Sequence, residues 1–78
     1  MTARDLTPAA IEGFVAADGR ACPYLASSPN WFAWTVGRCL ARTGRSAPRD
    51  VRMGRGYQVH ANGMLWAVAA DSAVTRIN

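Results

Sequence analysis

The pair Asn62-Gly63, with alternating apolar residues on both sides, constrains the fold of this chain more than any other feature. Both central residues of a type I′ hairpin turn need a positive φ, which asparagine and glycine tolerate best. A turn here pairs Ala61 with Met64 and so sets the register of the whole hairpin. The predicted apolar face holds Val59 opposite Trp66 and Tyr57 opposite Val68, and the other face holds Gln58, His60 and Leu65.

Two further stretches extend this sheet. Before the hairpin, Val51 and Met53 alternate with polar residues, and Gly54 and Gly56 predict a bulge that interrupts the strand. After the hairpin, residues 74–77 can add a third strand behind a turn at 71–72. We therefore expect an antiparallel meander of two or three strands.

Two helices are predicted before the sheet, each opened by a hydroxyl residue followed by proline. The first starts with Thr7 as N-cap and is expected to stop at Gly19, and the second spans residues 29–43 with Ser28 as N-cap. Apolar residues recur at helical spacing in both. The predicted core faces are Ile11, Phe14 and Val15 in the first helix and Phe32, Val36, Cys39, Leu40 and Thr43 in the second.

This order of elements predicts a single α+β domain of 78 residues. Its helical half covers residues 7–43, and its β-hairpin or meander covers residues 51–77. No stretch reaches the roughly 20 apolar residues that span a membrane, and the N-terminus lacks the apolar segment of a signal peptide. A cytoplasmic protein is therefore expected.

Positive charge is concentrated in one segment. The net charge is +4, the chain has no lysine, and six of its nine cationic residues fall between positions 38 and 55. An arginine-rich, lysine-free composition also arises from a GC-rich genome without selection for binding. The density of the cluster nevertheless favours an anionic or nucleoprotein partner.

Residues that carry catalysis are sparse. His60 has no nucleophile or orienting acid beside it in sequence, and a solvated strand position is the simpler interpretation. The acids show no paired spacing: Asp5, Glu12, Asp18, Asp50 and Asp71. Cys22 and Cys39, with one histidine, are too few for a structural zinc site, and we read them as small apolar groups or, less simply, a disulfide. We expect no enzyme activity, no metal and no cofactor.

A recognition surface has better support. Trp31, Trp34, Arg38 and Arg42 line up along the second predicted helix, and tryptophan and arginine are the residue types richest in binding hot spots. The alternative is that one or both tryptophans pack in a small core. The predicted partner-binding set is Trp31, Trp34, Arg38, Arg42, Arg45, Arg49, Arg52 and Arg55.

Residues 13–38 resemble the ribosome modulation factor family of small bacterial proteins. The similarity consists of Gly13-Phe14-Val15-Ala16, Gly19, Cys22-Pro23-Tyr24, Trp34 and Gly37. The resemblance implies two short helices that dock on ribosomal RNA or a ribosomal surface. It also implies that Cys22, Pro23, Tyr24 and Trp34 are mainly structural.

By size and type alone, the chain is also similar to phage-encoded anti-CRISPR inhibitors, which are compact lone domains without catalytic residues. The primary hypothesis is a non-enzymatic basic protein that inhibits or modulates a host nucleoprotein complex by steric docking, with direct RNA or DNA contact left open. The alternatives are a ribosome-associated factor and, third, a small-molecule-modifying enzyme that uses His60. A homodimer through Tyr57, Leu65 and Trp66 is a further expectation.

Overall fold

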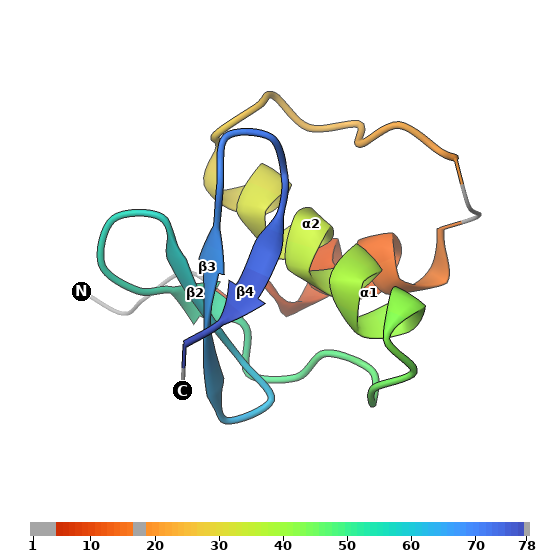
Figure 1. Ribbon diagram of the computed structural model, residues 1–78. Coiled ribbons are helices and arrows are strands. Elements are labelled where there is room, and N and C mark those ends of the chain that lie inside the picture. The colour runs from red at the N-terminus through yellow and green to blue at the C-terminus, as the bar shows by residue number, and fades with distance from the viewer. Residues whose placement is uncertain (1–4, 17–18, 78) are drawn as a thin grey trace.

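The computed structural model describes residues 5–16 and 19–77. Its elements are α1 (Thr7–Val15), α2 (Pro29–Arg42), β1 (Arg52–Met53), β2 (Gln58–Ala61), β3 (Met64–Val68) and β4 (Val74–Arg76). The strands form one antiparallel sheet in the order β1-β2-β3-β4. α2 packs against α1 on one side and against the sheet on the other, as Figure 1 shows. The α+β class is confirmed.

The second helix forms as its boundary signals predict. The Ser28 hydroxyl accepts a hydrogen bond from the Trp31 N–H at 3.2 Å, which caps the start of α2. At the other end Gly44 has φ of 70°, and the Arg45 N–H donates to the Leu40 carbonyl at 2.9 Å. This is a Schellman motif, which ends the helix and turns the chain toward the sheet.

The first helix differs from the prediction in its cap and its buried face. Thr7 is its first helical residue rather than its N-cap, and the Thr7 hydroxyl instead accepts a hydrogen bond from the Val51 N–H at 3.1 Å. The helix ends at Val15, well before Gly19; the expected extension through residues 17–18 lies outside the described residues. Ile11 and Val15 are 43% and 71% exposed, so the predicted apolar face is wrong apart from the half-buried Phe14.

α1 instead buries small residues, because the two helices approach each other very closely. A Cβ atom on Gly13 would lie 2.1 Å from the Trp34 carbonyl oxygen, and one on Gly37 would lie 2.0 Å from the Ala10 carbonyl oxygen. Only glycine fits at either position without moving a backbone. The hydrophobicity pattern favoured large residues on this face, whereas the crossing selects for small ones.

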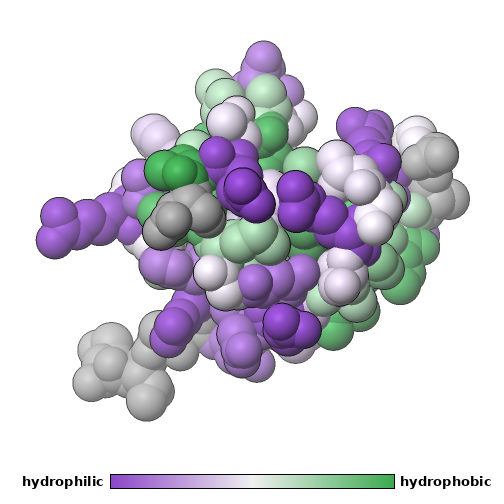
Figure 2. All heavy atoms as spheres, turned by 60° about the horizontal axis from the view of Figure 1, so that its bottom comes forward, coloured by the Kyte–Doolittle hydropathy of each residue, from purple (hydrophilic) through white to green (hydrophobic). Residues whose placement is uncertain are grey.

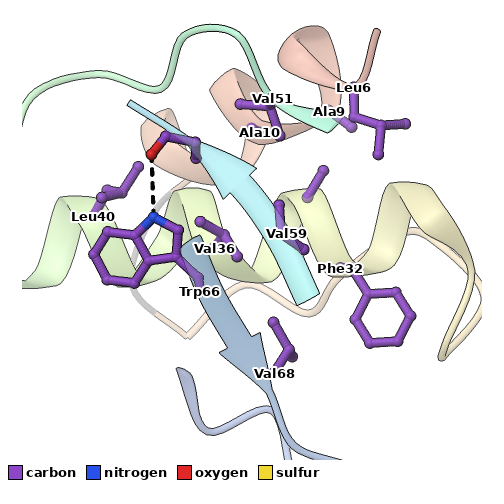
Figure 3. Packing of buried hydrophobic residues seen from close by; sticks show 12 residues of the cluster. Leu6, Ala9, Ala10, Phe32, Val36, Leu40, Val51, Val59, Trp66 and Val68 are labelled. Carbon is purple, nitrogen blue, oxygen red and sulfur yellow. Dashed lines mark hydrogen bonds between the residues drawn. The ribbon is translucent and has the colours of Figure 1, made fainter. Parts of the chain in front are cut away.

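The hairpin has the predicted register. Val59 pairs with Trp66 and Ala61 with Met64, and the turn residues Asn62 and Gly63 have φ of 56° and 73°. Val59, Trp66 and Val68 are buried on the face that meets α2. In Figure 3 these side chains lie between the sheet and the α2 residues Phe32, Val36 and Leu40.

The sheet departs from the prediction at its first strand and at Tyr57. β1 is a separate two-residue strand, so the sheet has four strands rather than two or three. Its chain leaves the ladder at Gly54, whose N–H donates to the Gln58 carbonyl at 2.8 Å. Tyr57 is 67% exposed rather than in the core, with its ring 5.7 Å from that of Phe32. Among the described residues, neither helix has the length and apolar character to cross a bilayer.

Candidate functional site

The predicted stripe on α2 is not a uniformly exposed surface. Trp34 and Arg38 are only 7% and 8% exposed, Trp31 is half-buried, and Arg42 alone is fully exposed. The expectation of an outward-facing stripe is therefore wrong for Trp34 and Arg38. The backbone of Trp34 lies at the crossing of the two helices, where its carbonyl oxygen faces Gly13.

Arg38 has a structural task at the end of α1. Its guanidinium donates to the Ala16 carbonyl at 2.7 Å and, with a longer contact of 3.5 Å, to the Gly13 carbonyl. The last carbonyls of a helix lack intrahelical partners and carry partial negative charge. Arg38 thus ties α1 to α2 and is unavailable as a surface anchor.

The four stripe residues still meet in one place. Trp31, Trp34, Arg38 and Arg42 all line a groove of about 670 Å³. Its other walls are the chain after α1, including Arg20 and Cys22, and the turn between β3 and β4, residues 70–74. Sequence reasoning missed this second wall, because only the folded sheet brings the β3–β4 turn to α2.

The groove combines apolar walls with a few charges. Arg20 and Arg42 are exposed, and Asp71, the one acid among its described lining residues, lies on the β3–β4 turn. At its edge, burial raises the pKa of the Cys22 thiol above its ordinary value, although a backbone hydrogen bond from Tyr24 opposes this. A raised pKa leaves the thiol protonated at neutral pH, so Cys22 is a poor nucleophile.

The second candidate site is the basic connector, residues 44–56, between α2 and β2. Its four remaining predicted contacts, Arg45, Arg49, Arg52 and Arg55, are all exposed. None of the four has an ion-pair partner within residues 5–16 and 19–77. Asp50, the acid inside the connector, is itself exposed and neutralises none of them. The predicted cluster of uncompensated positive charge is therefore present.

The connector is held to the sheet rather than hanging free. The side chain of Asn62 accepts from the Arg49 N–H at 2.8 Å and donates to the Ser46 carbonyl at 3.2 Å. The Asn62 N–H also donates to the Arg49 carbonyl at 3.0 Å. Sequence reasoning assigned Asn62 to the turn alone, and its second role as a tether had no sequence signal.

This tether brings two arginines to one hollow. Arg45 and Arg49 line a depression of about 320 Å³ together with Asn62 and Met64, and its described lining contains no acid. The Arg45 guanidinium lies 5.6 Å from the centre of the Trp66 ring, a distance at which the cation is attracted to the indole face. Trp66 thereby restrains a side chain that would otherwise move freely.

The other two arginines continue along the edge of the sheet. Arg52 pairs with His60 in the β1–β2 ladder, so β1 is the outer strand on this side, and Arg55 follows in the turn that leads to β2. In Figure 1 the first part of the connector, in green, runs along the lower side of the molecule, and its last part, in teal, forms the loop at the left that leads to β2. Figure 2 brings the lower side forward and shows hydrophilic residues gathered across its lower part, with hydrophobic residues at the lower right edge.

Metal-ligating groups do not gather in the part of the chain that the structure describes. No group of three or more histidine, cysteine or acidic residues suits a metal ion there. His60 is exposed on β2, and its ring lies beside Gly54. The predicted acid Asp18 lies outside the described residues.

Only part of the predicted self-association face lies on the surface. Trp66 is buried in the core and cannot contribute to it, whereas Tyr57 is exposed and Leu65 is half-buried. A homodimer stays a prediction, which a mass measurement in solution at two concentrations tests. A monomer mass at both concentrations would contradict it.

No family model matches the chain, and neither the curated proteins nor the solved structures contain a significantly similar one. The resemblance of residues 13–38 to the ribosome modulation factor family and the likeness to anti-CRISPR inhibitors stay predictions.

Proposed function

We propose that this protein is a non-enzymatic binding protein that docks on an anionic surface of a host nucleoprotein complex and blocks it sterically. An anti-CRISPR-like inhibitor is the most concrete form of this proposal. The docking surface is the basic connector with its four exposed arginines. Arg38 supports this surface only indirectly, because it ties α1 to α2, and Trp34 is buried.

One observation carries the proposal: the connector arginines lack carboxylate partners among the described residues and sit on a tethered segment. A flexible basic loop would lose conformational freedom when it binds, which lowers affinity. Holding Arg45 and Arg49 at one hollow before binding reduces that loss. Arginine in such a place suits phosphate or carboxylate, which it can bind with two parallel hydrogen bonds.

The test reverses charge on the connector and compares it with a charge reversal elsewhere. Tagged wild-type protein, the Arg45→Glu/Arg49→Glu variant and an Arg20→Glu control are used to capture partners from bacterial lysate, with and without nuclease. Arg20 is exposed on the chain between α1 and α2 and lines the groove, not the hollow that holds Arg45 and Arg49. We expect the connector variant to lose the captured complex and the control to keep it.

The nuclease arm identifies the kind of surface. Capture that disappears after nuclease treatment indicates phosphate contacts, and capture that survives indicates an acidic protein surface. If the connector variant captures the same complex as wild type, the connector is not the docking surface. Purified partner complexes then show by their residual activity whether docking inhibits them.

A ribosome-associated factor is the second candidate, because of what the resembling residues do in the fold. Gly13, Trp34 and Gly37 all lie at the point where α1 crosses α2. The resemblance therefore falls on residues that shape a two-helix unit, as a ribosome modulation factor would need. Co-sedimentation with ribosomes at low salt and release at high salt would favour this candidate, since phosphate contacts weaken as salt rises. Absence of co-sedimentation at low salt would exclude it.

A further inference from the structure

We propose that the groove between α2 and the β3–β4 turn binds a small organic monoanion: a carboxylate attached to an aromatic or apolar body. This site is separate from the connector. It lies on the other side of α2 from the core residues Val36 and Leu40 and is lined by none of the four connector arginines. The proposal therefore does not depend on the docking function.

The dimensions and walls of the groove suit a small molecule. Its volume of about 670 Å³ falls in the range of small-ligand sites, roughly 300–1,000 Å³. Trp31 and Trp34 on α2 and Val74 on β4 contribute apolar surface from opposite walls. Planar rings pack well against such indole walls.

Trp34 supplies the decisive observation. Its indole N–H is buried and has no hydrogen-bond partner among the described residues. The other fully buried indole, that of Trp66, does have one: its N–H donates to the Ala61 carbonyl at 3.2 Å, the dashed line in Figure 3. Buried donors are rarely left unpaired, because doing so destabilises the fold. Trp34 borders the groove, and a small turn of its ring, whose N–H is closed to solvent in the unliganded protein, would bring that N–H to an acceptor on a bound ligand.

The charges around the groove select a single negative group. Arg20 and Arg42 are exposed on its walls and have no ion pair within the described ranges, whereas Arg38 is already engaged with α1. A carboxylate can accept from the Trp34 N–H and also face an arginine. Asp71, whose carboxylate accepts from the Ala73 N–H at 3.1 Å, would repel a second negative charge on the ligand. A nucleic-acid backbone therefore fits this groove poorly.

The experiment follows the indole N–H signals of the three tryptophans by nitrogen-15 NMR. Each signal is assigned to its residue through contacts between the indole ring and that residue's own backbone. The probe is naphthoate, and its neutral analogue naphthylmethanol is the matched control. We expect naphthoate to move the Trp34 signal in a saturable way and to leave the Trp66 signal in place. Naphthylmethanol should produce a much weaker effect.

Two variants test which arginine attracts the carboxylate of naphthoate. Arg42→Gln should weaken naphthoate binding by about two- to fivefold, because one exposed ion pair is lost. Arg76→Gln removes an exposed arginine that does not line the groove and should leave the affinity unchanged. The connector variant Arg45→Glu/Arg49→Glu should also retain naphthoate binding, which separates this site from the docking surface.

Three results would overturn the proposal. The Trp34 signal could stay in place at millimolar naphthoate, naphthylmethanol could bind as well as naphthoate, or Arg76→Gln could weaken binding as much as Arg42→Gln. The core signals of each variant are compared with those of wild type, and a variant is used only if they are unchanged, so none of these outcomes reduces to a folding defect.

Discussion

Arg38 and Arg42 lie one turn apart on α2, yet they differ in burial and in hydrogen bonding. Arg38 is buried and donates to two carbonyls at the end of α1, while Arg42 is exposed on the groove wall. A buried hydrogen bond from a charged donor stabilises a fold by about 1.5–3 kcal/mol, and a domain this small has only a few kcal/mol in total. Sequence position alone does not reveal this difference.

The first prediction is that Arg38→Glu destabilises the protein and Arg42→Glu does not. The Arg38 change puts a carboxylate against the negative end of α1 and should cost about 2 kcal/mol or more of unfolding free energy. The Arg42 change, at an exposed site in the last turn of α2, should cost at most about 1 kcal/mol. Urea denaturation of both variants measures this. Equal stability of the two would show that Arg38 does not tie the helices together.

Gly13 and Gly37 set the distance between the helices, and this gives the second prediction. In Gly37→Ala the new Cβ would meet the Ala10 carbonyl oxygen at 2.0 Å, so α1 must move away. We expect a net loss of about 2 kcal/mol, or about 10 °C in Tm, despite the helix preference of alanine. In the control Gly54→Ala, the new Cβ would meet the end of the exposed His60 side chain at 3.1 Å and the Gln58 Cβ at an ordinary contact distance of 3.4 Å. A small loss is expected there, and an equal loss in both variants would contradict the account.

At the scale of elements, the hairpin turn and the basic connector act as one unit. Asn62 forms the turn with its backbone and holds the connector with its side chain. Its exchange for glycine separates the two roles, because glycine accepts a positive φ but offers no side-chain hydrogen bonds.

The third prediction is that Asn62→Gly keeps the hairpin but loosens the connector. The amide of Arg49 should exchange with solvent markedly faster, while those of β2 and β3 keep their protection. Affinity for the captured partner should fall although every arginine is retained. Unchanged exchange at Arg49 would mean that the connector is held by other contacts.

The elements of this fold were predictable where the sequence carries explicit boundary signals. Ser28-Pro29 and Gly44 gave α2, and Asn62-Gly63 gave the hairpin and its register, because each signal has a specific backbone requirement. The face of α1 was not predictable from hydrophobicity, since the crossing selects residues for size. The small residues Ala10, Gly13, Ala33 and Gly37 were the available signal for it.

The candidate sites were predictable only in part. The uncompensated charge of the connector followed from composition, because there are too few acids nearby to neutralise it. The burial of Trp34 and Arg38 depends on how α1 lies across α2, and the groove depends on where the β3–β4 turn falls. Both features depend on tertiary packing, which no local sequence pattern encodes.

At the scale of the whole molecule, the net charge of +4 is unevenly placed. Arg45 and Arg49 line the hollow beside Met64, whereas Arg20 lines the groove. If a connected surface rather than overall charge drives binding, charge reversals at these two places must have unequal effects per charge. Salt dependence separates the two cases, because the slope of log affinity against log salt becomes shallower by about 1 for each lost phosphate contact.

The most direct test is the affinity of the captured partner as a function of salt for wild type, Arg45→Glu/Arg49→Glu and Arg20→Glu. We expect the connector variant to bind far more weakly, with a slope shallower by about 2 on a nucleic-acid partner, and the Arg20 variant to stay close to wild type. Equal losses per charge in the two variants would show that net charge, and not the tethered connector, determines binding.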